Sequence, residues 1–104
     1  MAKNEMSREV FPGVTKREWN AALRLFLANP YWKEYYETAP SEKCRAYVGL
    51  EFCNSNRDNE AVREAMKELR EELELEDWKH LLKYSGNNPM RGYIRKKIRE
   101  MEEN

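Results

Sequence analysis

The sequence has few of the residues from which metal sites, disulfides and catalytic centres are built. Its 104 residues include one histidine, His80, and two cysteines, Cys44 and Cys53, with no CxxC pair, so a zinc site is unsupported. The cysteines lie nine residues apart in one predicted helix. Their Cα atoms would then be roughly 13 Å apart, beyond the roughly 7 Å limit for a disulfide. We therefore expect two free thiols, buried as small apolar residues.

Catalytic and cofactor-binding patterns are also sparse. Asp77 and His80 share a helix face at i, i+3 spacing, but a di-metal bundle needs such a pair on two helices and further acids. The four glycines are isolated and form no phosphate-binding loop. We predict a non-enzymatic protein with no catalytic residue, no metal and no cofactor. His80 is expected to be solvent-facing or partly buried, with Glu76 or Asp77 as its neighbour.

Long apolar runs are missing as well. No stretch approaches the roughly 20 apolar residues that a membrane helix requires, and the first residues lack the apolar stretch of a signal peptide. We therefore expect a cytoplasmic protein without a membrane partner. The length favours one helical domain over 1–104, in which residues 1–10 are flexible. Aromatic, Leu and Met side chains are numerous enough to form its core.

Helix signals run through the chain, whereas strand signals are almost absent. Thr15 and Glu18 form a Thr-x-x-Glu capping box, and Ser41 stands where it can cap a later helix. The fold class is therefore all-α, a small single-domain bundle of about five helices. The predicted helices are 16–28, 42–54, a long acidic helix capped by Asn56 or Asp58 that breaks near Glu74–Glu76, and a basic C-terminal helix from Pro89. Residues 31–38 are expected to form a short aromatic turn or helix.

Charge is sorted along the second half of the chain, although the formal net charge is zero. From Asp58 to Asp77 there are nine acids and three bases, and from Lys79 to Arg99 there are seven bases and no acid. Sorting of this kind is typical of a surface that meets another charged surface. On the acidic helix, Glu64 and Glu68 are candidate protein-binding residues. The interleaved bases also fit an ordinary solvated helix face.

Four neighbouring aromatic residues form the second candidate protein-binding feature: Tyr31, Trp32, Tyr35 and Tyr36. Trp and Tyr are typical anchors of interfaces, but in a small domain they also build the core, and both interpretations stay open. With the charge sorting, this cluster favours a protein-interaction module. Its partner would be another protein, or a second copy in a homodimer that places the acidic face of one chain against the basic face of the other.

The basic segment supports an alternative function in nucleic-acid binding. Residues 75–84, the turn 85–88 and the helix from Pro89 have the sizes of a helix-turn-helix. Against this interpretation stand the acids at both ends of the segment and a near-neutral isoelectric point. A short turn with glycine also joins ordinary antiparallel helices. The residues that would contact nucleic acid are Arg91, Tyr93, Arg95, Lys96 and Arg99.

Overall fold

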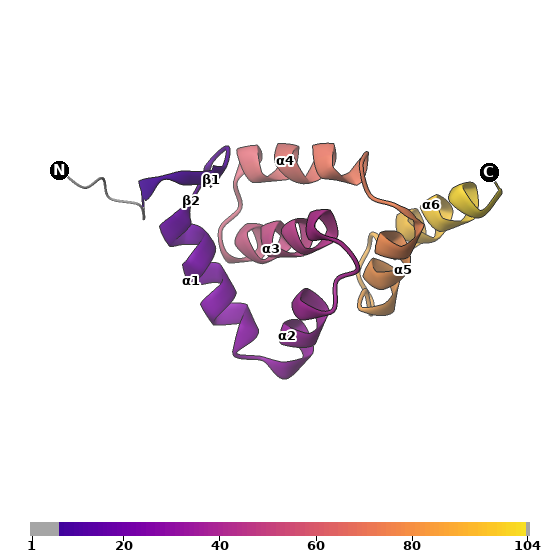
Figure 1. The fold of residues 1–104 in the computed structure, drawn as a ribbon, viewed down its shortest axis with the longest axis horizontal. Coiled ribbons are helices and arrows are strands. Elements are labelled where there is room, and N and C mark those ends of the chain that lie inside the picture. Colours follow the sequence, from indigo (N-terminus) through magenta and orange to yellow (C-terminus); the bar gives the residue numbers. More distant parts are fainter. Residues whose placement is uncertain (1–6, 104) are drawn as a thin grey trace.

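The computed structural model describes residues 7–103, which form six helices and one small sheet (Figure 1). The elements are β1 (Glu9–Phe11), β2 (Val14–Thr15), α1 (Lys16–Leu27), α2 (Pro30–Glu37), α3 (Glu42–Asn56), α4 (Glu60–Arg70), α5 (Leu75–Lys83) and α6 (Arg91–Glu103). The prediction of a small, mostly all-α domain is confirmed. None of the described helices combines the length and apolar character needed to cross a membrane.

The two strands form an antiparallel hairpin that the sequence did not predict. Gly13 closes its turn with a φ of +83°, and its N–H donates to the Glu9 carboxylate over 3.1 Å. Glu9 is also paired with Thr15. The expected flexibility of residues 1–10 is therefore wrong at Glu9, and residues 1–6 lie outside the described part of the chain. Strands of two and three residues are too short to show an alternating pattern.

The first helix begins as its capping box predicts. The Glu18 N–H donates to Thr15 Oγ1 over 3.2 Å, and the Thr15 N–H donates to Glu18 Oε1 over 3.1 Å. On α1, the indole of Trp19 lies directly against α3 at Gly49. A Cβ built on Gly49 would stand 2.2 Å from that ring, so only glycine allows the two helices to approach this closely.

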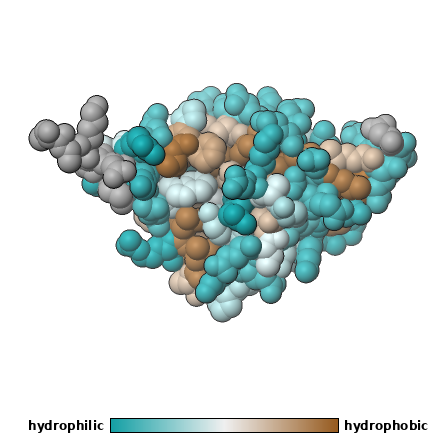
Figure 2. Space-filling view, viewed as in Figure 1, coloured by the Kyte–Doolittle hydropathy of each residue, from teal (hydrophilic) through white to brown (hydrophobic). Residues whose placement is uncertain are grey.

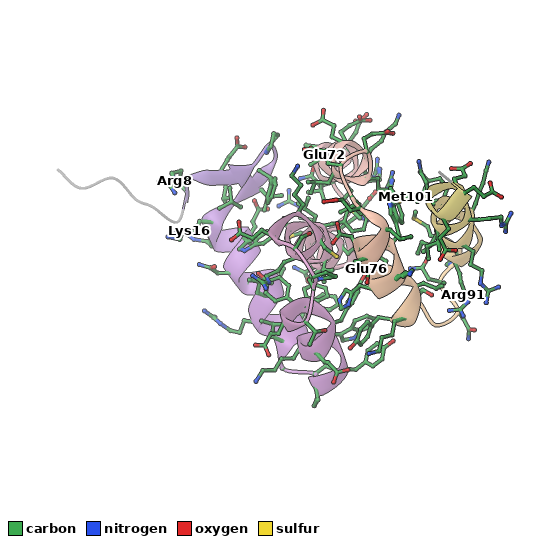
Figure 3. All side chains as sticks on the ribbon, turned by 45° about the vertical axis from the view of Figure 1, so that its right-hand side comes forward. Arg8, Lys16, Glu72, Glu76, Arg91 and Met101 are labelled. Atoms are coloured by element: carbon green, nitrogen blue, oxygen red, sulfur yellow. The ribbon has the colours of Figure 1, made fainter. Side chains whose placement is uncertain are left out.

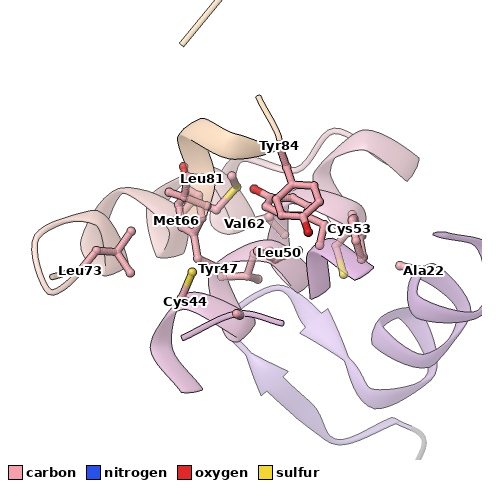
Figure 4. Packing of buried hydrophobic residues seen from close by; sticks show 14 of the residues in the cluster. Ala22, Cys44, Tyr47, Leu50, Cys53, Val62, Met66, Leu73, Leu81 and Tyr84 are labelled. Atoms are coloured by element: carbon pink, nitrogen blue, oxygen red, sulfur yellow. The ribbon is translucent and has the colours of Figure 1, made fainter. Parts of the chain in front are cut away.

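Helix α3 is the centre of the fold, and other helices cover it on several sides (Figure 1). Its buried residues, seven in number, therefore point in several directions rather than along one stripe. Figure 4 shows side chains of α3, α4 and α5 gathered around Leu50, which is fully buried. Cys44 and Cys53 are free and buried in this helix, as predicted. Ser41 caps it, accepting a hydrogen bond from the Cys44 N–H.

The predicted long acidic helix is divided into two helices, α4 and α5, which the non-helical residues 71–74 separate. The prediction of Asn56 or Asp58 as the cap is wrong. Asn59 caps α4, accepting from the N–H groups of Ala61 and Val62, and Asn56 belongs to the last turn of α3. The break itself is confirmed, a few residues earlier than predicted.

Helices α5 and α6 form a hairpin at the end of the molecule opposite β1 (Figure 1). Gly86 has a φ of +52° in the connecting turn, a left-handed conformation that favours glycine. Asn88 Oδ1 accepts from the Met90 N–H over 2.8 Å and so starts the turn that leads into α6. The apolar stripe of α6 faces α5, with Ile94 buried in the core.

Candidate functional site

The first candidate surface is the acidic face of α4, defined by four exposed glutamates: Glu60, Glu64, Glu68 and Glu71. The bases between them reduce its charge less than the sequence suggested. Arg70 turns inward and donates to the Tyr47 hydroxyl over 3.1 Å, while Arg63 forms an ion pair with Asp58. Within residues 7–103, no ion pair joins Glu64 or Glu68 to a cation. Both predicted binding residues are therefore exposed and unpaired.

The second candidate surface is the basic face of α6, defined by the exposed side chains of Arg95, Lys96 and Arg99. None of the three forms an ion pair in the part of the chain that the structure describes. Lys79 of α5, in contrast, lies 3.8 Å from a Glu102 carboxylate oxygen and 3.7 Å from one of Glu76. The basic face therefore keeps its charge available for a partner outside the chain.

Arg91 and Tyr93, the other two predicted nucleic-acid contacts, are engaged within the hairpin. Arg91 Nη1 donates to Ser85 Oγ over 2.8 Å. It also lies 3.5 Å from the Leu82 carbonyl oxygen, in the last turn of α5, and 3.4 Å from the Gly86 carbonyl oxygen, in the turn that follows. A cation at this position stabilises the negative end of a helix. The Tyr93 ring stands edge-on to Trp78, with centroids 5.8 Å apart. Of the five predicted residues, Arg91 is therefore partly buried, whereas Tyr93, Arg95, Lys96 and Arg99 are exposed.

The aromatic cluster of α2 lies mainly in the core. Tyr35 is 5% exposed, Trp32 and Tyr36 are half-buried, and Tyr31 is 46% exposed. The cause is that α2 has only two turns and packs on α3, so most of its rings point inward. Tyr31 also donates from its hydroxyl to the Tyr84 carbonyl over 3.0 Å. Of the four residues, Tyr31 offers the largest accessible fraction to a partner.

The exposed apolar residues of the described chain are spread over several elements. On the face drawn in Figure 2, apolar residues form separate areas among hydrophilic side chains. The large apolar residues with the most exposed side chains are Val10, Leu25, Tyr31 and Tyr93, which come from four different elements. Charge is therefore a better guide to the interaction surfaces than apolar area.

His80 lies in a different setting from the one predicted. It is 9% exposed, its Nε2 is 2.7 Å from the Tyr35 carbonyl oxygen, and its ring stacks on the Tyr35 ring. The Asp77 carboxylate does not pair with it, because it accepts from the Ser41 hydroxyl and the Glu74 N–H. The solvent-facing position and the expected neighbours are therefore wrong. Among the described residues, no group of His, Cys, Asp and Glu side chains is arranged to hold a metal ion.

One partly buried acid was missed. Glu51 lies on α3, and the Tyr35 hydroxyl donates to its Oε1 over 2.5 Å. Burial raises the pKa of Glu51 to about 7, against the lowering effects of the Tyr35 hydrogen bond and the Arg70 charge. Its spacing was the available signal: Glu51 follows Tyr47 by four residues and Val48 by three, which places it on the apolar side of the helix.

Comparison with known proteins found no match for this chain among protein families, curated proteins or solved structures.

Proposed function

We propose that this protein is a non-enzymatic interaction module that associates with a second copy of itself through its two charged faces. The observation that carries the proposal is that the acidic face of α4 and the basic face of α6 are both exposed and have opposite charge. Complementary charge of this kind steers association and fixes the orientation of partners. A two-fold dimer would bring α4 of each copy against α6 of the other.

The two faces do not neutralise each other within one chain. Figure 1 shows α5 between the end of α4 and α6, and Figure 3 labels Glu76 at the start of α5 and Arg91 at the start of α6. Among the described residues, no ion pair joins α4 to α6. The ion pair that reaches α6 comes from α5 and joins Lys79 to Glu102. Each charged face is therefore available to another copy.

The expected dimer is weak and sensitive to salt. An exposed ion pair contributes roughly 0.2–1 kcal/mol, so about six pairs in two equivalent contacts would give a dissociation constant on the order of 1 mM. At physiological ionic strength the Debye length falls to about 8 Å, which screens such pairs. We therefore expect association at low salt and mostly monomer at physiological salt.

A charge-swap experiment with sedimentation velocity tests the proposal. The first variant makes the basic face acidic through Arg95→Glu, Lys96→Glu and Arg99→Glu. The second makes three residues of the acidic face basic through Glu64→Lys, Glu68→Lys and Glu71→Lys. Each variant alone should be monomeric at low salt, because like charges then meet in both contacts. A mixture of the two should associate, because opposite charges meet again.

A matched control reverses three exposed bases elsewhere on the surface: Arg17→Glu, Arg24→Glu and Lys33→Glu on α1 and α2. It changes the net charge by the same amount as the first variant but leaves both faces intact. The control should keep more association than that variant. A wild-type protein that stays monomeric at high concentration and low salt would refute self-association, and so would a mixture that fails to associate.

The free basic face also supports a second candidate function, binding to nucleic acid. Three phosphate contacts by Arg95, Lys96 and Arg99 would give a slope of about −3 in a plot of log affinity against log salt. Fluorescence anisotropy with a DNA duplex and a single-stranded RNA measures this slope. Loss of binding in the Arg95→Ala/Lys96→Ala variant, with retention in Arg17→Ala/Arg24→Ala, would favour this function over self-association.

A further inference from the structure

A cavity of about 150 Å³ lies inside the molecule, and side chains of α1, α2, α3, α5 and α6 line it. Seven of its lining residues are aromatic, and one, Glu51, is acidic. The cavity opens toward solvent near Ser55, at the end of α3, and Asn88, in the turn before α6, since both residues are exposed. None of its lining residues belongs to either charged face.

No ion pair joins the Glu51 carboxylate to a cation in the described part of the chain, although the charge of Arg70 acts on it. The carboxylate accepts a hydrogen bond from the neutral Tyr35 hydroxyl, and Arg70 donates to the Tyr47 hydroxyl. A carboxylate in low-dielectric surroundings is stabilised strongly by a cation that approaches it. A cation inside the cavity could therefore make the direct ionic contact with Glu51 that Arg70 does not make.

A second polar group at the cavity has no partner either. Trp78 is 1% exposed, lines the cavity, and has no acceptor for its Nε1–H among the described residues. A buried N–H without an acceptor costs about 1–3 kcal/mol, so such groups are usually satisfied. An oxygen atom supplied by a bound molecule would remove this cost.

We infer that the cavity binds a small organic ammonium ion that also carries an acceptor oxygen, of the class of choline and ethanolamine. The positive charge would meet the Glu51 carboxylate and the faces of the surrounding rings, which attract cations through their quadrupoles. The oxygen would accept from Trp78 Nε1. Nothing in the sequence predicted a small-molecule ligand, because the lining residues come from five separate helices.

Size and charge exclude the other simple ligand classes. A cavity of about 150 Å³ is the size that accepts benzene, and choline is only moderately larger than benzene. A small anion would be repelled by Glu51 when that side chain is ionised. An uncharged apolar ligand would fill the space but would leave the carboxylate without a cation and the indole N–H without an acceptor.

Titration of the whole chain with choline and with 3,3-dimethylbutan-1-ol, its uncharged isostere, tests the inference. Intrinsic tryptophan fluorescence reports binding because Trp32 and Trp78 line the cavity. Calorimetry measures the heat of binding independently. The titration is done at pH 8, where Glu51 is mostly ionised. Choline should bind at least tenfold more tightly than the isostere. Equal affinity for the two, or no binding of either, would overturn the inference.

Two variants separate the roles of the polar groups. Glu51→Gln keeps the acceptor for Tyr35 but removes the charge, so it should weaken choline binding at least tenfold and leave the isostere unaffected. Trp78→Phe removes the N–H and should weaken choline without weakening tetramethylammonium, which has no oxygen. Glu37→Gln, an exposed acid on α2, is the matched control. An unchanged choline affinity in a folded Glu51→Gln protein would contradict the assignment.

Discussion

Replacing Glu51 by glutamine should stabilise the protein at neutral and alkaline pH. Burial raises the pKa of this side chain from its ordinary value of 4.5 to about 7. At pH above 7 the folded state must hold an ionised carboxylate that would titrate near 4.5 in the unfolded chain. The difference corresponds to about 3 kcal/mol of lost folding free energy.

The sign and the pH window follow from the same pKa values. Below pH 4.5 the carboxyl is protonated in both states, and Glu51 imposes no ionic cost. Between pH 4.5 and about 7 the unfolded chain loses its proton first, so the wild-type protein loses stability as the pH rises. Above about pH 7 the cost is constant. The Glu51→Gln protein lacks this pH-dependent loss of unfolding free energy.

Urea unfolding of the two proteins from pH 4.5 to 8.5 measures the effect. The variant's advantage should grow by about 3 kcal/mol over this range, since other titrating groups affect both proteins and cancel. The Tyr35 and Tyr47 hydroxyls near Glu51 have raised pKa values and stay protonated over this range. A difference in unfolding free energy that stays constant with pH would refute the reasoning.

Three further predictions concern packing, capping and thiol reactivity. Gly49→Ala should destabilise the fold by about 1–3 kcal/mol in urea unfolding, because the new Cβ would stand 2.2 Å from the Trp19 ring. Asn59→Ala should cost about 1–2 kcal/mol in the same assay, since it removes both the cap of α4 and a 3.1 Å hydrogen bond to the Gly13 carbonyl. Cys44, whose pKa burial raises to about 12, should react with a thiol reagent at pH 8 only as fast as the protein opens, so urea should accelerate labelling steeply.

The sequence predicted those features of the fold that depend on neighbouring residues. Thr15 and Ser41 were recognised as caps because the groups that they bond lie three residues away. The cap of α4 was placed wrongly because Asn56, Asp58 and Asn59 all have suitable side chains within four residues. Asn59 is the one that also donates to the Gly13 carbonyl, a contact 46 residues away in the sequence.

The candidate surfaces were predicted less completely, for the same reason. Glu64 and Glu68 are exposed because the apolar spacing of α4 fixes which side faces the core. Arg91 belongs to the same basic helix as Arg95, and composition alone does not separate them. They differ because Arg91 reaches back to Ser85 at the end of α5, a contact that depends on the shape of the turn.

The cavity and the attachment of the α5–α6 hairpin are physically connected. Polar contacts join α2 to α5 along one side: His80 Nε2 to the Tyr35 carbonyl at 2.7 Å, and the Tyr84 hydroxyl to the Glu34 carboxylate at 2.6 Å. The cavity interrupts the apolar packing behind these contacts, with Glu51 on the α3 side and Trp78 on the α5 side. A molecule that contacts both residues would add interactions across this boundary. Because it would bind the folded state alone, the proposed ligand would hold the hairpin, and with it the basic face of α6, more firmly on the rest of the molecule.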